Sequence, residues 1–312
     1  MGFYNFEEFC EAVTREISEY LGGEAEWEVQ VHPIMKNNGI LLHALQILSE
    51  DRNCSPSIYL EPYYSSYEKG SSMDELLKEM AEFYWQHEND LQLEVKAITS
   101  FAGMKDKIIM RMVNLERNRE LLAESPYVVW NDLAITFRWM AYQNDVGIAT
   151  ALITNRELQQ WQVDVEVLMQ TALENTPRYF PAYFRDIEEL VKEIVPAQEW
   201  EQFQKEWNQE EQQLPMYVLT NSQRMNGAAV ILYPGMLEQL SQQYPQGFYL
   251  LPSSIHEWIL IPWEAEIEVT ELQQMVANVN EEAVAQAEWL SENIYCYRTE
   301  TEGIQVVFCQ NY

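Results

Sequence analysis

The residues best suited to chemistry stand together in the segment PSSIHE, which holds Ser253, Ser254, His256 and Glu257. A serine nucleophile needs a histidine base within hydrogen-bond reach and an acid that orients this base. These residue types therefore suggest a hydrolase that uses His256 with Ser253 or Ser254. Side chains of neighbours in one tight turn diverge, however, and the segment lacks the GxSxG pattern that exposes a catalytic serine. The hydrolase is kept as an alternative hypothesis, and a hydrogen-bonded hairpin turn is the simpler interpretation.

A second set of candidates is the alternating acidic row Glu264, Glu266 and Glu268. An extended backbone would place these carboxylates on one face, about 6.6 to 6.8 Å apart. Such a row could imitate phosphates and occupy the basic groove of a nucleic-acid enzyme. The simpler interpretation is a solvated edge that its charge protects from aggregation. We name the three glutamates as candidate binding residues and the nucleic-acid-mimicking decoy as a second alternative function.

The histidines offer one weak metal candidate. The chain has four of them, namely His32, His43, His87 and His256. His32 and His43 lie on the two arms of an expected hairpin and face each other if Asn37-Asn38 form its turn. If Asn38-Gly39 form the turn, which is the more usual case, Leu45 faces His32 instead. We therefore predict no metal site there.

The sequence also lacks the usual cofactor motifs. It contains no Walker loop and no GxGxxG, and His87-Glu88 is not followed by the second histidine of HExxH. The cysteines are scattered without a CxxC pair, and we expect buried free thiols rather than a zinc or redox site; they are Cys10, Cys54, Cys296 and Cys309. We predict that the protein holds no cofactor.

The charge of the chain restricts its partners. Its 312 residues include 50 Asp and Glu against 19 Lys and Arg, which gives a formal net charge of −31. Such a field repels phosphate backbones and anionic lipid, so we expect neither direct nucleic-acid binding nor membrane binding. Basic proteins are compatible partners. With 47% hydrophobic residues, the chain has enough apolar surface to fold despite this charge.

One stretch is locally basic. Five cations fall between residues 105 and 119, and we expect them to offset nearby acids; they are Lys105, Lys107, Arg111, Arg117 and Arg119. The alternation in KIIMRMV predicts a strand, which would place Lys107, Ile109, Arg111 and Val113 on one face.

The cellular location is predicted from the lack of a recognisable signal peptide and of a membrane span. The amino terminus is acidic and amphipathic, without the positive and apolar regions of a signal peptide. No apolar run approaches the roughly 18 residues that a membrane span needs. We expect a soluble, cytoplasmic protein, and the sequence does not indicate its oligomeric state.

The densest apolar patterning lies in residues 214–263, where short β-branched and aromatic runs are bounded by Asn, Gly, Pro and Ser. We predict strands at 216–219, 228–233, 248–251 and 258–261, and a helix at 236–244. This unit would give the rest of the chain a sheet to pack on.

The remaining elements follow from periodicity and turn signals. In the first part we predict a helix at 5–21, hairpin strands at 27–35 and 40–48, a strand at 57–60, a polar loop at 63–72 and a helix at 73–91. In the middle we predict strands at 107–113, 128–130, 133–142 and 147–153, then helices at 154 onward, 164–175 and 185–195, and a surface connector at 197–213. The end would hold a helix at 270–279 and a hairpin at 293–298 and 304–308.

The chain resembles an uncharacterised bacterial family, the family of unknown function numbered 5688. The segments that carry the resemblance are IYLEPYYSSYEKG, ITNRELQQWQVDVEVLMQTALEN, YVLTNSQRMNGAAVILYP and FYLLPSSIHEWILIP. The same pieces in the same order are more distantly similar to family 1444, which implies a shared fold. Neither resemblance implies a catalytic residue, a cofactor or a substrate.

These observations together predict an α+β fold, with mixed or antiparallel sheets, packed helices and two closely associated halves. The first half would span residues 1–122 and contain the Asn-Gly hairpin, and the second would span 123–312 and contain the unit at 214–263. The leading function is a non-enzymatic binding protein whose acidic surface meets a protein partner, with a basic protein as the compatible type.

Overall fold

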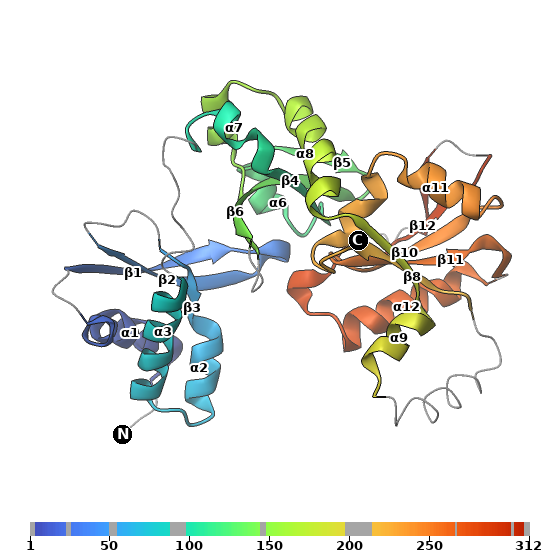
Figure 1. Ribbon diagram of the computed structural model, residues 1–312. Coiled ribbons are helices and arrows are strands. Elements are labelled where there is room, and N and C mark those ends of the chain that lie inside the picture. The colour runs from blue at the N-terminus through green and yellow to red at the C-terminus, as the bar shows by residue number, and fades with distance from the viewer. Residues whose placement is uncertain are drawn as a thin grey trace.

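The computed structural model describes residues 4–22, 26–49, 55–87, 98–143, 148–196, 214–265, 267–300 and 303–308. The described strands form three sheets with helices packed on them, which confirms the predicted α+β class. Every described strand pair is antiparallel. Figure 1 shows the amino-terminal sheet at one end of the molecule and the carboxy-terminal sheet at the other.

The amino-terminal module packs three helices on a sheet of order β1-β2-β3. Its first helix begins with a capping box, in which Asn5 and Glu8 satisfy each other's backbone N–H groups. A separate core fills this module, with Phe9, Leu45 and Leu77 fully buried. The elements are α1 (Phe6–Leu21), β1 (Trp27–Met35), β2 (Leu41–Ser49), β3 (Ile58–Tyr59), α2 (Leu60–Glu68) and α3 (Met73–His87).

Helix α2 replaces the polar loop predicted at 63–72, so that prediction was wrong. Tyr64 and Tyr67, three residues apart, lie on the same side of this helix and contact α1. The ring centroid of Phe9 lies 5.4 Å from that of Tyr64 and 5.5 Å from that of Tyr67. Because these aromatic contacts come from a distant segment, local polarity alone did not indicate the helix.

The β1–β2 hairpin has neither of the two predicted registers. Asn37–Gly39 form a short 3₁₀-helix, with Asn38 in the left-handed region at φ 59°. His32 therefore pairs with Ala44 and His43 pairs with Pro33. Because successive side chains alternate across a strand, the two histidines point to opposite faces, which excludes them as a metal pair.

The second sheet is built around the long strand β6. Strand β4 pairs with one edge of β6, and β5 and β7 pair with the two ends of its other edge. The predicted division of the chain after residue 122 falls between β4 and β6, inside this sheet. The elements are α5 (Phe101–Met104), β4 (Ile108–Asn114), α6 (Arg119–Ala123), β5 (Tyr127–Trp130), β6 (Leu133–Gln143), β7 (Ile148–Leu152), α7 (Asn155–Trp161) and α8 (Val165–Tyr179).

The third sheet has six strands in the order β13-β12-β10-β11-β9-β8. Its centre confirms the predicted strands at 216–219, 248–251 and 258–261, while β8 was not predicted. The predicted connector at 197–213 lies outside the described residues. The elements are β8 (Ala182–Asp186), α9 (Ile187–Ile194), β9 (Tyr217–Asn221), α11 (Met236–Gln243), β10 (Phe248–Ser254), β11 (Glu257–Pro262), α12 (Val269–Glu282), β12 (Ile294–Tyr297) and β13 (Ile304–Phe308).

The strand predicted at 228–233 is instead a buried 3₁₀-helix, Gly227–Leu232. A Cβ at Gly227 would lie 2.2 Å from the Oγ1 of Thr220 and 2.5 Å from the carbonyl oxygen of His256. The indole Nε1 of Trp258 donates to the carbonyl of Ala228 at 2.7 Å. This tight approach of the backbone to β9 and to the β10–β11 turn fills the space that a further strand would need.

One large core joins the second and third sheets. Phe137 of β6, Trp258 of β11 and Tyr295 of β12 are buried in the same cluster. The ring of Trp130 in β5 stacks on that of Tyr295, with centroids 5.7 Å apart. These two sheets therefore form one folded body, whereas the amino-terminal module has its own core.

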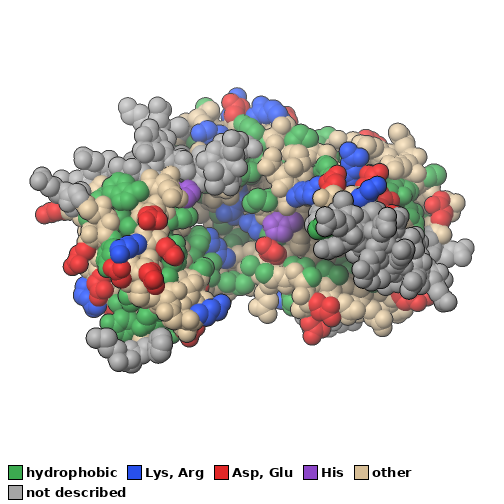
Figure 2. Space-filling model, turned by 60° about the horizontal axis from the view of Figure 1, so that its bottom comes forward, with side chains coloured by type: hydrophobic (Ala, Val, Ile, Leu, Met, Phe, Trp, Pro, Cys, Tyr) green, Lys and Arg blue, Asp and Glu red, His purple; other side chains and the backbone are tan. Residues whose placement is uncertain are grey.

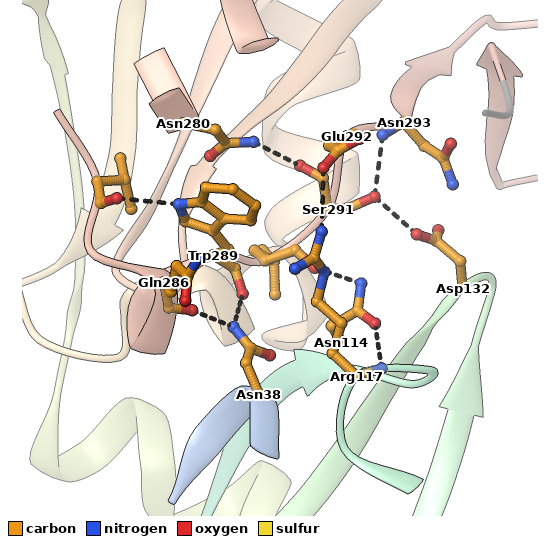
Figure 3. A network of polar contacts seen from close by, with 12 residues as sticks. Asn38, Asn114, Arg117, Asp132, Asn280, Gln286, Trp289, Ser291, Glu292 and Asn293 are labelled. Carbon is orange, nitrogen blue, oxygen red and sulfur yellow. Dashed lines mark hydrogen bonds and ion pairs between the residues drawn. The ribbon is translucent and has the colours of Figure 1, made fainter. Parts of the chain in front are cut away.

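The tip of the β1–β2 hairpin joins the amino-terminal module to this body through side-chain amides (Figure 3). The Nδ2 of Asn37 donates to the carbonyl of Ala287 at 2.6 Å. The Nδ2 of Asn38 donates to the carbonyls of Gln286 and Trp289 at 2.7 and 2.8 Å.

A third asparagine completes this junction. Asn118 is 1% exposed, and its Oδ1 accepts from the backbone N–H of Asn38 at 2.9 Å. Its Nδ2 donates to the Oδ1 of Asn38 at 3.0 Å and to the carbonyl of Asn114 at 2.8 Å. Asn114 in turn donates to the carbonyl of Leu290 at 2.9 Å. The hairpin tip is therefore held by several hydrogen bonds at one place.

Candidate functional site

A large apolar groove of about 550 Å³ lies on the third sheet, between α9 and α12. Figure 1 shows both helices on the same side of this sheet. Strands β9, β10 and β11 form the floor with Val218, Leu251 and Ile259. The groove has the size of a ligand or peptide pocket, and its lining is mostly hydrophobic, as in such pockets.

Helix α9 forms one wall because its apolar residues recur at helical spacing. Ile187, Leu190 and Val191 line the groove. The helix begins where the Oδ1 of Asp186 accepts the backbone N–H of Glu188 at 2.8 Å. Strand β8 directly precedes this cap and pairs with β9, so the sheet edge fixes the position of the helix.

Helix α12 forms the opposite wall. Met275, Val276 and Val279 line the groove, spaced one, three and four residues apart on one side of the helix. Val276 is 4% exposed and belongs to the core under this helix. Val279 is 40% exposed, and therefore offers apolar surface to an incoming molecule.

Polar side chains gather at one end of the groove, where Thr220, Arg224, Ser253 and Glu257 line it. The Oγ of Ser253 lies 3.4 Å from the Oε1 of Glu257. The Arg224 guanidinium contacts the Glu193 carboxylate at 3.3 Å. The Arg224 charge is therefore offset by Glu193, while the Glu257 carboxylate keeps its charge beside the Ser253 hydroxyl.

The structure separates the predicted hydrolase residues. Ser253 lines the groove, but the next residue along the strand, Ser254, is 7% exposed and its Oγ accepts the backbone N–H of His256 at 3.0 Å. The His256 ring instead accepts the backbone N–H of Asn226 at Nδ1, at 3.0 Å, and places Nε2 3.3 Å from the Glu288 carboxylate. In this arrangement neither serine hydroxyl contacts the imidazole.

The predicted acidic row is not formed as expected. Glu264 lies in a 3₁₀-helix, Trp263–Ala265, and Glu268 directly precedes α12. Glu266 lies outside the described residues. Because an alternating row needs extended backbone through all three positions, the expected spacing is wrong at Glu264.

The described residues offer neither a metal site nor a membrane-spanning helix. No cluster of three or more His, Cys, Asp or Glu side chains in that part of the chain is arranged to hold a metal ion. His43, one of the histidines considered for such a site, places its Nδ1 2.9 Å from the Glu61 carboxylate. No described helix combines the length and apolar character that crossing a bilayer would require.

The sequence contained part of the signal for the groove. A helix was predicted at 185–195 and another at 270–279. Their placement over one sheet face was not predicted, because β8 was missed and it is the strand that carries α9 to the sheet edge.

Comparison with known proteins gives a family and nothing further. The family described as "Family of unknown function (DUF5688)" matches residues 6–299. No curated protein and no solved structure matches the chain. The distant similarity to family 1444 stays a prediction.

Proposed function

Because the chain belongs to this family of unknown function, which supplies no activity, we propose a function from the groove. The protein is a cytoplasmic, non-enzymatic binding protein, and the groove between α9 and α12 takes an apolar segment of a basic protein partner. The observation that carries this proposal is the open apolar hollow of about 550 Å³ with exposed Val279 on its wall. Docking of an apolar helix face or peptide into such a groove is a common form of recognition.

Charge supports the choice of a basic partner. The two helices that form the walls carry six glutamates and one lysine. These residues are Glu188, Glu189, Lys192, Glu193, Glu271, Glu281 and Glu282. A segment with Lys or Arg on either side of its apolar residues would complement this rim, and the net charge of −31 would accelerate its approach.

Site-specific photo-crosslinking tests the proposal. A benzophenone side chain replaces Val279 in one variant and Val129 in another. Val129 of β5 is 55% exposed and does not line the groove, so it is the matched control. We expect the first variant alone to capture a protein from cells, and less of it at high salt because salt screens the charges. Mapping the crosslinked peptide should identify an apolar segment flanked by Lys or Arg.

A substitution pair provides the second arm. Val279→Asp places a charge in the apolar wall and should abolish capture by a crosslinker at Met275, whereas Val129→Asp should leave it unchanged. A captured segment that is acidic or lacks apolar residues would overturn the proposal, and so would equal capture by the two Val→Asp proteins.

A further inference from the structure

Two arginines on neighbouring strands of the second sheet point to one face. Ile109 of β4 pairs with Arg138 of β6, and Arg111 pairs with Thr136 two residues along. Because positions i and i+2 of a strand share a face, Arg111 and Arg138 are diagonal neighbours. Both side chains line a small cavity of about 50 Å³.

The cavity is closed by parts of three other elements. Thr150 of β7 and Thr176 of α8 contribute to its wall, together with Asn221 at the end of β9 and Asn226 in the segment that follows. The volume is a few times the space that one water molecule needs. It therefore suits one small polar group rather than a whole metabolite.

Neither guanidinium meets a carboxylate in the described part of the chain. The Nε of Arg138 donates to the Oγ1 of Thr150 at 2.9 Å. The Nε of Arg111 is buried without a hydrogen-bond partner. Two such cations are unexpected in a protein with 50 acids and 19 basic residues, because a buried charge is costly unless it is paired.

Two other arginines of the basic stretch at residues 105–119 form ion pairs with glutamates. Arg117 contacts the Glu292 carboxylate at 3.1 Å, and Arg119 contacts that of Glu116 at 2.7 Å. The prediction that these cations offset nearby acids is confirmed for both. Arg111 forms no such ion pair among the described residues: its guanidinium lies in the cavity, where Glu288 raises its pKa without an ion-pair contact.

Burial and like charge act together on Arg111. The pKa of its guanidinium falls to about 9, because burial and, to a smaller extent, the charge of Arg138 lower it, while Glu288 opposes both effects. Burial also lowers the pKa of Arg138. With a pKa of about 9, Arg111 is charged at neutral pH, and an anion between the two guanidinium groups would remove much of the cost of burying them.

The cavity also holds an acceptor without a donor. The Oδ1 of Asn226 is buried and has no hydrogen-bond partner. Its backbone lies in the left-handed region at φ 52° and is fixed by the hydrogen bond from its N–H to His256. A ligand that fits would therefore combine negatively charged oxygens with an O–H or N–H donor.

The surroundings of the cavity favour an anion. Figure 2 shows Lys, Arg and His side chains in the hollow between the two ends of the molecule, with acidic atoms next to the histidine. Tyr59 of the amino-terminal module lies close enough to Arg138 to act on its pKa, and Lys36 bonds the Tyr59 hydroxyl. Positive charge is concentrated here although the chain as a whole is strongly acidic.

We propose that the cavity between Arg111, Arg138 and Asn226 binds an oxyanion, either the phosphate or the carboxylate group of a small ligand. Arginine is suited to this role because its planar fork of N–H donors matches both groups. The inference does not depend on the groove between α9 and α12, which lies on the other sheet.

Thermal unfolding of the full chain tests the proposal. Tm is measured with increasing sodium phosphate, acetate, lactate or chloride at one ionic strength. We expect a saturable rise of roughly 3 to 8 °C with the matching oxyanion and none with chloride, because a ligand that binds the native state alone stabilises it. A rise with phosphate alone identifies a phosphate group, and a rise with lactate or acetate alone identifies a carboxylate.

Two variants and one control locate the effect. Arg111→Met and Arg138→Met should each abolish the rise, while Arg15→Met should keep it, because Arg15 is an exposed arginine paired with Glu16. Near-ultraviolet circular dichroism checks that the variants are folded. If a variant is not folded, the comparison of oxyanions with chloride on the wild-type protein tests the proposal without it. The proposal is overturned if no oxyanion raises Tm more than chloride does, or if the rise survives in both cavity variants.

Discussion

Arg117 and Arg111 lie six positions apart and have opposite surroundings. Arg117 follows the end of β4, contacts the Glu292 carboxylate at 3.1 Å and covers the Trp289 ring at 4.7 Å. Arg111 lies inside β4 with a buried Nε that has no partner. At the junction of the hairpin tip most polar groups are hydrogen-bonded to one another, with the buried Oδ1 of Asn37 as an exception, and these bonds hold the amino-terminal module to the rest of the molecule. At the cavity, by contrast, buried polar groups are left without a partner, and this region is arranged for a ligand.

The largest expected effect concerns the junction. Asn118→Ala removes three hydrogen bonds and leaves polar groups of Asn38 and Asn114 unpaired. We expect the free energy of unfolding to fall by about 3 kcal/mol, because unpaired buried polar groups are costly. Urea denaturation measures this change. Asn155→Ala, which removes one exposed bond to Ala123, should cost less than about 0.5 kcal/mol.

The cavity should respond in the opposite direction. Arg111→Met keeps much of the side-chain volume and removes a buried charge that has no partner. In buffer free of oxyanions we expect the free energy of unfolding to rise by about 2 kcal/mol, since apolar replacements of buried charges are often stabilising. The same denaturation experiment measures it. A loss of stability of that size would mean that the structure already satisfies this arginine.

A smaller effect is expected for the paired arginine. Arg117 and Glu292 are each about one quarter to one third exposed, so solvent weakens their attraction. A double-mutant cycle with Arg117→Met and Glu292→Gln should give a coupling energy of about 1 kcal/mol. The corresponding cycle with Arg111→Met and Glu292→Gln should give no measurable coupling.

The smallest expected effect is a pH dependence of the difference in the free energy of unfolding between the wild type and Arg111→Met. The pKa of this guanidinium is about 9 in the folded chain and well above that in the unfolded chain. Above pH 9 the unfolded state binds more protons, so wild-type stability rises with pH. The gain in stability of the Arg111→Met variant over the wild type is therefore largest below about pH 8 and becomes smaller above pH 9. The Cys10 thiol, whose pKa burial raises to about 11, affects both proteins alike and cancels.

Local patterns predicted most of the strands and helices because their apolar residues follow the period of the element. The failures share one cause, which is packing against distant residues. Tyr64 and Tyr67 form a helix because they contact Phe9. The run after Gly227 is apolar enough for a strand, yet close contact with Thr220 turns it into a 3₁₀-helix.

The candidate sites were less predictable than the fold. The alternation in KIIMRMV correctly placed Ile109, Arg111 and Val113 on one face of β4. The residues that close the cavity around Arg111 include Asn226, more than a hundred residues later in the sequence, so the local pattern could not predict what faces this arginine. Similarly, Ser254 and His256 lie two residues apart in sequence, but the Ser254 hydroxyl accepts the backbone N–H of His256, while the His256 ring accepts that of Asn226.

The hairpin tip has a consequence for how the protein is made. Asn37 and Asn38 contact carbonyls that lie 248 to 251 residues later in the chain. At roughly 5 to 20 residues per second, a ribosome needs roughly 12 to 50 seconds to supply those partners. The amino-terminal core ends at Tyr84, so this module can be complete long before then. Its two asparagines meet water until residues 286–289 emerge, and docking of the tip is one of the last steps of folding in the cell.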